Sequence, residues 1–313
     1  MALEFNPTIR TASALDLAAG LGDEISTAHL LAGLVTAAPS IARILDAFDV
    51  TPTVAVHVVR ECDKEWNGPD GVAQPDAEIV LPKALRVTDG AAAALLHATR
   101  ESPGRECRPE TLLLAVLRDD RARATAVLRA CGIDPETVRA AAAGGDIPPR
   151  TDPVSADLRP IRDRMIGRER FRGNGLRAFL FQKIFKNPYP YAAAPTLWIS
   201  LESEQIARQR GGARRTDDLL IAMLATYRVA TAYPHLTTDN AEGYDGSREL
   251  AAAGLDHRRL EEAAATLDLG EDGISVKSLL TRDDWPRTTT DLLARLTAHD
   301  DTRSARLLKA LRA

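Results

Sequence analysis

The stretch STAHLLAGL, residues 26–34, has three counterparts later in the chain. They are RPETLLLAVL at 108–117, RRTDDLLIAML at 214–224 and TTTDLLARL at 288–296. Each copy begins with a helix-start signal, either a threonine whose oxygen can cap free backbone N–H groups or a first-turn proline. These residues are Thr27, Pro109, Thr216 and Thr289. A pair of leucines follows, and apolar residues continue at helical spacing, so each copy predicts an amphipathic helix.

A second short helix is predicted after each copy, in the stretches 41–50, 124–134, 247–256 and 304–313. Each stretch contains a leucine that follows the first leucine of the preceding pair. The intervals are 15 residues from Leu30 to Leu45, 16 from Leu112 to Leu128, 31 from Leu219 to Leu250 and 16 from Leu292 to Leu308. The third interval contains an insertion, YPHLTTDNAEGYDG. Gly132 and Gly254 fall just past predicted helix ends, where a left-handed conformation is favoured, and Asp49 and Arg312 take those places in the other copies. The pattern predicts an all-α architecture of repeated units.

The bulk composition is that of a soluble globular protein. The 313 residues suit two domains, with 45% hydrophobic and 27% charged residues. Three scattered cysteines without CxxC spacing argue against a disulfide framework or a zinc knuckle. The net charge of −4 argues against a general nucleic-acid binder. The first residues lack a signal-peptide pattern, and no apolar run approaches the roughly 20 residues of a membrane helix, so we expect a cytoplasmic protein.

The order of segments resembles a known family. EFNPTIR (4–10), STAHLLAGL and IARILDAFDV (41–50) together are similar to the N-terminal domain of Clp-family AAA+ unfoldases, of the ClpC or ClpA type. In that family the domain is a tandem pair of four-helix repeats, each with an F-T-P-like opening and a G-T-E-H-L-L-L-G-L signature. Residues 3–50 and 79–138 resemble the two repeats, and residues 195–256 and 274–313 resemble a second, more degraded pair.

The resemblance implies two similar all-α halves. We expect a Clp-N-like domain over 1–145, a linker with a basic, aromatic helix over 146–194, and a degenerate second domain over 195–313. The sequence contains no G-x-x-x-x-G-K-[ST] phosphate loop, so we expect a stand-alone docking domain without an ATPase module. It also contains no G-x-S-x-G or H-E-x-x-H motif, and its six histidines never pair at a ligand spacing. We therefore expect no enzyme activity, metal or cofactor, although a cryptic enzyme without a linear motif stays an alternative.

In the family, this domain docks substrates and adaptor proteins, and in some ClpC proteins it receives phosphoarginine. The resemblance assigns the guanidinium to signature glutamates and the phosphate to threonines of the opening segments. In this chain the first glutamate position holds Ala28, the second keeps Glu110, and Asp217 takes the corresponding place in the second half. The threonine positions align with Asn6 and Leu81. General peptide docking is therefore expected ahead of phosphoarginine recognition.

Cyclic-peptide antibiotics also bind this domain in the family, on the face made by the two opening segments. Phe5 keeps the aromatic residue of the first segment, and Val80 replaces that of the second, with Lys83 close behind it. These three residues join Asn6, Glu110 and Asp217 as predicted ligand-binding residues.

The middle of the chain, residues 159–192, is basic and aromatic. It holds nine Arg or Lys against Asp163 and Glu169, a net charge of +7. The part GLRAFLFQKIFK (175–186) predicts a helix with an aromatic face that includes Phe179, Phe181 and Phe185. Three interpretations stay open: a linker helix that docks on one half, a partner-binding helix, or a nucleic-acid contact through arginines and stacking aromatics.

The sequence as a whole predicts a non-enzymatic peptide- or protein-binding protein of the Clp proteolysis system. It would act as an adaptor, or as a decoy that sequesters substrates or Clp-targeting peptide antibiotics and so confers resistance. Its expected partners are Clp unfoldase or protease components or their substrate peptides. The regulatory alternative is nucleic-acid binding through residues 159–192.

Overall fold

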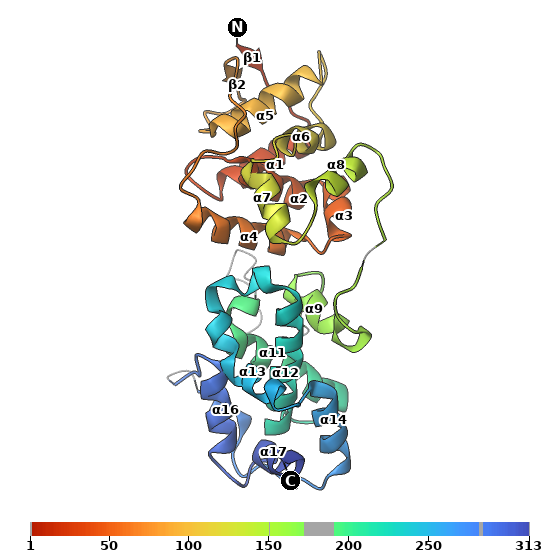
Figure 1. Cartoon of the computed structure of the whole chain (residues 1–313), viewed down its shortest axis with the longest axis vertical. Coiled ribbons are helices and arrows are strands. Elements are labelled where there is room, and N and C mark those ends of the chain that lie inside the picture. The colour runs from red at the N-terminus through yellow and green to blue at the C-terminus, as the bar shows by residue number, and fades with distance from the viewer. Residues whose placement is uncertain (1, 150, 172–190, 282–283, 313) are drawn as a thin grey trace. The chain divides into compact units, whose positions relative to one another are not determined.

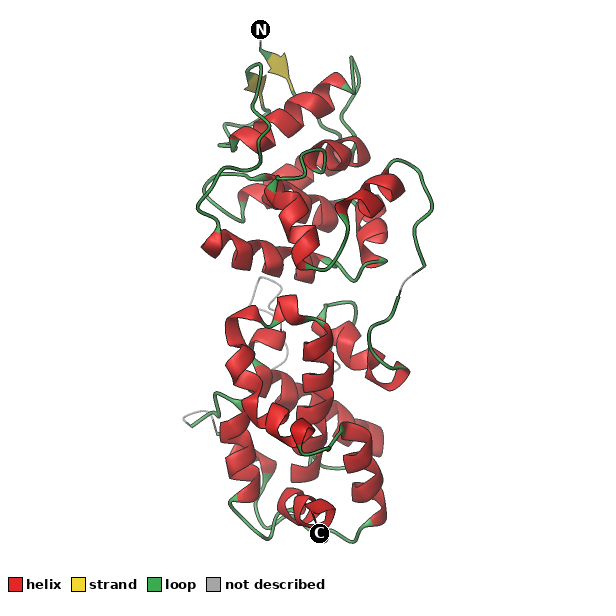
Figure 2. Cartoon of the chain, viewed as in Figure 1, coloured by secondary structure: helices red, strands yellow, loops and turns green. Residues whose placement is uncertain are grey.

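The protein is described by a computed structural model that covers residues 2–149, 151–171, 191–281 and 284–312. It is a largely helical protein, with about 61% helix and 3% strand (Figures 1 and 2). The chain forms two compact units, which are described separately: unit 1 runs to Asp152, and unit 2 contains the described residues from Pro153 onward.

Unit 1 is a set of short helices with one very small sheet. In chain order its elements are β1 (Leu3–Glu4), α1 (Ile9–Ala19), α2 (Thr27–Ala37), α3 (Pro39–Asp46), α4 (Pro52–Glu65), β2 (Ile79–Val80), α5 (Asp89–Arg100), α6 (Pro109–Val116), α7 (Arg123–Ala130) and α8 (Pro135–Ala142). The strands pair in parallel, with Leu3 opposite Ile79 and Glu4 opposite Val80. The sheet therefore joins two segments about 75 residues apart in the chain.

The core of unit 1 is built around α2. Nearly all of its residues are buried, and it packs against α1, α3, α4 and α7. Gly33 lets α1 approach closely, because a Cβ at this position would lie 2.2 Å from the carbonyl oxygen of Ala14. A helix this apolar on all sides is expected only at the centre of a packed unit.

Unit 2 is also largely helical. Its elements are η1 (Ala156–Leu158), α9 (Arg159–Met165), η2 (Tyr191–Ala193), α11 (Pro195–Arg210), α12 (Thr216–Ala232), η3 (Pro234–Leu236), η4 (Thr238–Tyr244), α13 (Asp245–Ala252), α14 (His257–Thr266), α15 (Val276–Leu279), α16 (Thr289–Thr297) and α17 (Arg303–Arg312). The buried helix here is α12, which packs against α11, α13, α14 and α17. The insertion predicted after the third copy forms η3 and η4.

The leucine pattern is confirmed as the core pattern of both units. All eight residues of the four leucine pairs are buried, and so are the four leucines predicted in the following helices: Leu30, Leu31, Leu112, Leu113, Leu219, Leu220, Leu292, Leu293, Leu45, Leu128, Leu250 and Leu308. Gly132 and Gly254 have φ values of +74° and +79°, as their places after helix ends predict. Asp49 adopts the same conformation with φ +62°.

The predicted helix caps are wrong by one residue. Thr27, Thr216 and Thr289 each occupy the first helical position, and the preceding residues are the N-caps. The threonine hydroxyls instead accept hydrogen bonds from backbone N–H groups of other helices: Thr27 from Ala124, Thr216 from Ser304 and Thr289 from Ser247. Pro109 does occupy the first helical position of α6, as predicted.

Candidate functional site

The predicted docking residues of unit 1 lie around the small sheet. Phe5 is buried, with 1% of its surface exposed, so its ring belongs to the core and offers a ligand little contact area. Asn6 is exposed, and its carbonyl oxygen accepts a hydrogen bond from the Cys107 backbone N–H. Val80 is 46% exposed, and its carbonyl oxygen accepts from the Phe5 N–H at 2.9 Å.

Helix α1 carries two exposed apolar side chains. Ile9 is 85% exposed and Leu17 is 44% exposed, and their spacing of eight residues places them on one face of α1. Lys83 is linked to this helix, because its ammonium lies 2.5 Å from the Asp16 carboxylate. The side chains of Ile9, Leu17, Val80 and Lys83 define what we call the α1 face.

Glu110 lies close to the N-terminus of α1. The backbone N–H of Thr8 and the hydroxyl of Thr11 both donate to the carbonyl of Cys107, at 3.1 and 2.8 Å, three residues before Glu110. Thr8 is the N-cap of α1, and Thr88 is the N-cap of α5. The hydroxyls at the starts of these two helices are therefore those of Thr8 and Thr88. The sequence analysis did not identify them, because it matched the threonine positions of the family to Asn6 and Leu81.

Thr88 lies beside a buried carboxylate, that of Asp70. Asp70 accepts hydrogen bonds from the hydroxyl of Thr88 at 2.7 Å, from the backbone N–H and hydroxyl of Thr27 at 2.6 and 2.5 Å, and from the Arg123 N–H at 2.9 Å. The Thr27 hydroxyl in turn accepts from the Ala124 N–H at 3.1 Å. Asp70 and Thr27 thus satisfy free N–H groups at the starts of both α2 and α7, and we call this arrangement the clasp of unit 1.

Four of these five bonds recur in unit 2 around Asp272, without a counterpart of the Thr88 bond. The backbone N–H and hydroxyl of Thr216 donate to Asp272 at 3.0 and 2.5 Å, and the Arg303 N–H donates at 2.8 Å. The Ser304 N–H donates to the Thr216 hydroxyl at 3.0 Å. This is the clasp of unit 2, and it joins α12 to α17 as the clasp of unit 1 joins α2 to α7.

Asp217 is not available to a ligand. Only 2% of its surface is exposed, and its Oδ2 accepts from both Nε and Nη2 of Arg303, each at 3.0 Å. This ion pair raises the pKa of Arg303 further above its ordinary value. At the corresponding place in unit 1, Ala28 offers no carboxylate, and Arg123 donates to the Gly68 carbonyl at 2.8 Å and stacks over Trp66.

His29, the histidine of the signature, is held on both sides of its ring. The Ser26 N–H lies 3.1 Å from Nδ1, and Asp63 Oδ2 lies 2.7 Å from Nε2. Nδ1 also lies 3.1 Å from the Glu24 carbonyl oxygen, so the ring contacts the segment before α2 as well as Asp63 on α4. The ring is 4% exposed in this arrangement, so it contributes to the start of α2 and to its link with α4.

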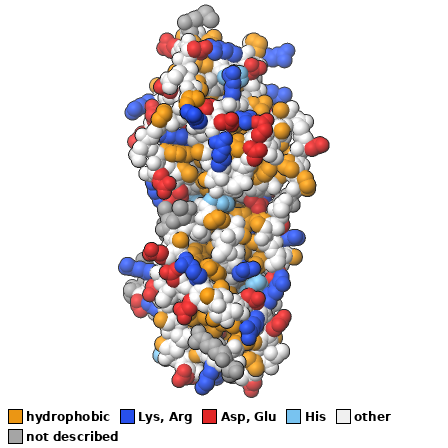
Figure 3. Space-filling view, viewed as in Figure 1, with side chains coloured by type: hydrophobic (Ala, Val, Ile, Leu, Met, Phe, Trp, Pro, Cys, Tyr) orange, Lys and Arg blue, Asp and Glu red, His pale blue; other side chains and the backbone are white. Residues whose placement is uncertain are grey.

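The basic segment 159–192 is described only in part. Arg162 is 1% exposed and bonds Asp163 and the hydroxyl of Tyr233, while Arg164 pairs with buried Glu202 at 2.6 Å. These two arginines anchor α9 inside unit 2. Phe179, Phe181 and Phe185, with the helix predicted around them, lie outside the described residues. Basic and acidic side chains are interspersed on the face shown in Figure 3.

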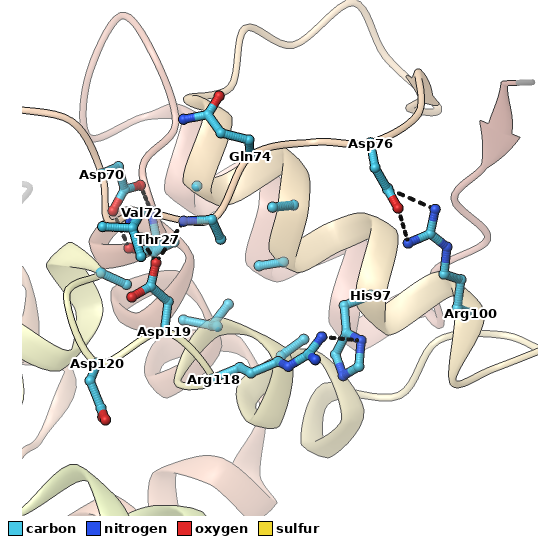
Figure 4. Close-up of a pocket in the computed structure, with 17 residues that line it drawn as sticks. Thr27, Asp70, Val72, Gln74, Asp76, His97, Arg100, Arg118, Asp119 and Asp120 are labelled. Atoms are coloured by element: carbon cyan, nitrogen blue, oxygen red, sulfur yellow. Dashed lines mark hydrogen bonds and ion pairs between the residues drawn. The ribbon is translucent and has the colours of Figure 1, made fainter.

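Unit 1 contains a cavity of about 500 Å³ beneath the segment 70–76. Its floor is formed by α5 and the end of α6, and the segment 118–122 closes one side (Figure 4). Asp119 holds the covering segment, because its Oδ2 accepts from the Val72 and Ala73 N–H groups at 2.7 and 2.9 Å. At the other end, Asp76 forms two hydrogen bonds with the Arg100 guanidinium.

No cluster of His, Cys, Asp or Glu in the described ranges has a geometry suited to a metal ion. No single helix in those ranges is long and apolar enough to cross a membrane, and α2 with α3 meets that test only as a pair bent by 102°.

No protein-family model matches the chain, and no curated protein matches it significantly.

Proposed function

We propose that the chain is a non-enzymatic docking protein, built from two similar halves that each resemble the Clp N-terminal domain. The two clasps support the proposal of two halves, since four equivalent hydrogen bonds join equivalent helices. A further pair of contacts agrees with it: Thr11 donates to the carbonyl of Cys107 just before α6, and Thr196 donates to that of Pro286 just before α16, both at 2.8 Å. Both sets of contacts therefore support two halves of similar construction.

The α1 face is the proposed docking surface, and its exposed apolar side chains carry the proposal. Among the described residues, six large apolar side chains are exposed, and Ile9, Leu17 and Val80 are three of them. Exposed apolar side chains next to a charged pair are typical of a surface that binds another chain. A ligand segment would bury these side chains and could pair its own charges with Lys83 or Asp16.

Unit 1 is favoured over unit 2 as the docking half. At the start of α6, Glu110 is only half-buried and lies near two threonines, so a basic group of a ligand can reach it. In unit 2 the position that matches Glu110, two residues before the leucine pair, holds Thr290. Asp217, which matches Ala28, already binds Arg303. In the second half, the acidic group that the family offers to ligands is therefore already bound by an arginine of the same unit.

The proposed role is that of adaptor or decoy in the cytoplasm. The 313 residues contain no phosphate-binding loop of the unfoldase type, so these residues can bind a Clp ligand but have no such motif with which to hydrolyse ATP. Substrate peptides, Clp components and Clp-directed cyclic peptides are the proposed ligands. Phosphoarginine is a narrower possibility that depends on Glu110.

The test is a binding comparison on the full chain. The ligands are labelled peptides from Clp substrates, a phosphoarginine peptide, a Clp-directed cyclic peptide and a purified Clp unfoldase. The variant Ile9→Asp places a charge on the α1 face, and Leu267→Asp places one on an exposed apolar residue of unit 2. We expect at least one ligand to bind, with about tenfold loss in Ile9→Asp and none in Leu267→Asp. Absence of binding by every ligand, or equal loss in both variants, would refute the proposal.

A further inference from the structure

The cavity beneath residues 70–76 has opposite charges at its two ends. Asp70, Asp119 and Asp120 lie at one end, and Arg118, His97 and the Arg100–Asp76 ion pair lie at the other, as Figure 4 shows. Between them the floor is formed by small apolar side chains, including Ala93, Ala94 and Val116. None of these residues belongs to the α1 face.

The acidic end keeps its negative charge and one acceptor position. Burial acts to raise the pKa of Asp119, but N–H donors from Arg121, Ala73 and Val72 outweigh it and lower the pKa below its ordinary value. A carboxylate offers about four acceptor positions, and these three N–H groups use three of them. One position on Asp119 therefore stays open to an ammonium group.

The basic end presents N–H donors. Arg118 Nη1 donates to His97 Nδ1 at 3.0 Å, and because a guanidinium can only donate, His97 must accept at Nδ1 and carry its proton on Nε2. Burial and the nearby Arg118 charge lower the pKa of His97, which agrees with a neutral ring. Among the described residues, no carboxylate pairs with Arg118, so its remaining N–H groups are available to a ligand carboxylate.

The length of the cavity along α5 suits a very short peptide. Gly90 lies against Asp70, and His97 follows seven residues later on α5, which corresponds to roughly 10 Å along the helix. Three extended residues span about the same length. We propose that this cavity binds a short zwitterionic peptide, with its ammonium at Asp119, its carboxylate at Arg118 and small apolar side chains on the alanine floor.

The experiment titrates the full chain by calorimetry with three probes: trialanine, N-acetyl-trialanine and trialanine amide. Trialanine is expected to bind with one-to-one stoichiometry. Removal of either terminal charge is expected to weaken binding about tenfold, because each charge makes a charge-assisted hydrogen bond. The variant Ile9→Asp should leave all three affinities unchanged, which separates this site from the proposed docking surface.

Two variants and one control test the assignment of the ends. Arg118→Gln should abolish the preference for trialanine over its amide, whereas Arg121→Gln, in the same loop but outside the cavity, should keep it. Ala93→Phe should fill the cavity and block every probe without any change of charge. The proposal is overturned if trialanine does not bind, if the blocked peptides bind equally well, or if Arg118→Gln keeps the preference.

Discussion

At the scale of single residues, Asp70 and Thr27 show how side chains from elsewhere in the fold accept hydrogen bonds from N–H groups at helix starts, in addition to a local cap such as Ser26. Thr27 is the first residue of α2, yet its hydroxyl receives an N–H of α7 and donates to Asp70. A buried carboxylate with several N–H and O–H donors is stable only while all of them are present. The clasp therefore holds the starts of two helices that are nearly 100 residues apart.

The first prediction concerns Asp70. Asp70→Asn keeps the shape but removes the charge and places an amide NH₂ where an acceptor is needed. We expect the free energy of unfolding of unit 1 to fall by about 3 kcal/mol, measured by urea denaturation. Asp23→Asn, at an exposed position of the same unit, is the control and should change little. Equal stability of Asp70→Asn and the wild type would show that the clasp does not stabilise the fold.

The second prediction concerns pH and Asp157. The Arg258 guanidinium, together with His257, holds the pKa of Asp157 well below its usual range. A carboxyl group with a lowered folded-state pKa stabilises the fold above its unfolded-state pKa, near 4, and loses that effect as the pH falls toward the folded-state value. The stability difference between the wild type and Asp157→Asn should be largest at pH 7 and shrink below about pH 4. Urea midpoints across this range measure it, with exposed Asp300→Asn as the control; a difference independent of pH would contradict it.

Single residues also show where sequence reasoning ends. Gly132, Gly254 and Asp49 could be placed in the left-handed conformation, because helix ends demand it locally. The partner of Asp217 could not be predicted, since Arg303 lies 86 residues later in the chain. The same limit applies to Asp70, whose neighbours are determined by tertiary packing and not by local pattern.

At the scale of elements, the leucine pairs predicted the buried helices because a helix that packs on several sides must be apolar at adjacent positions. At α2 the predicted cap position was wrong because Ser26 and Thr27 are both residue types that can cap a helix. Only the position of Asp70 decides which of the two caps α2. No pattern in the sequence predicted the cavity beneath residues 70–76. It depends on how a loop lies over α5, which helical periodicity does not describe.

The third prediction concerns the crossing of α1 and α2. Gly33→Ala would place a methyl group against the Ala14 carbonyl oxygen, so one helix must shift. We expect a loss of about 2 kcal/mol in the stability of unit 1. Gly68→Ala is the matched control, because a Cβ there meets no atom within 4 Å. Thermal or urea unfolding of both variants measures the difference, and a neutral Gly33→Ala would mean that the crossing is less tight than described.

At the scale of the whole molecule, the two units are proposed to be similar in construction and different in use. Unit 1 carries the α1 face, Glu110 and the charged cavity. In unit 2, the Asp217 carboxylate is already paired with Arg303. The sequence predicted two halves from four copies of one pattern. It could not predict which half keeps an accessible surface, because that depends on the exposure of individual side chains.

The fourth prediction follows from this division. A fragment of residues 1–152 should fold, as judged by its helical circular dichroism spectrum, and should bind the docking ligand as tightly as the full chain. A fragment of residues 153–313 should fold without binding it. Binding by the second fragment alone would reverse the assignment of docking to unit 1.

The most direct test of the central claim is to map a bound docking peptide on the isotopically labelled full chain by NMR chemical-shift changes. The account predicts that the largest changes fall on α1, on Val80 and Lys83, and at the start of α6. Changes confined to unit 2, or the absence of any localised change at saturating peptide, would contradict it.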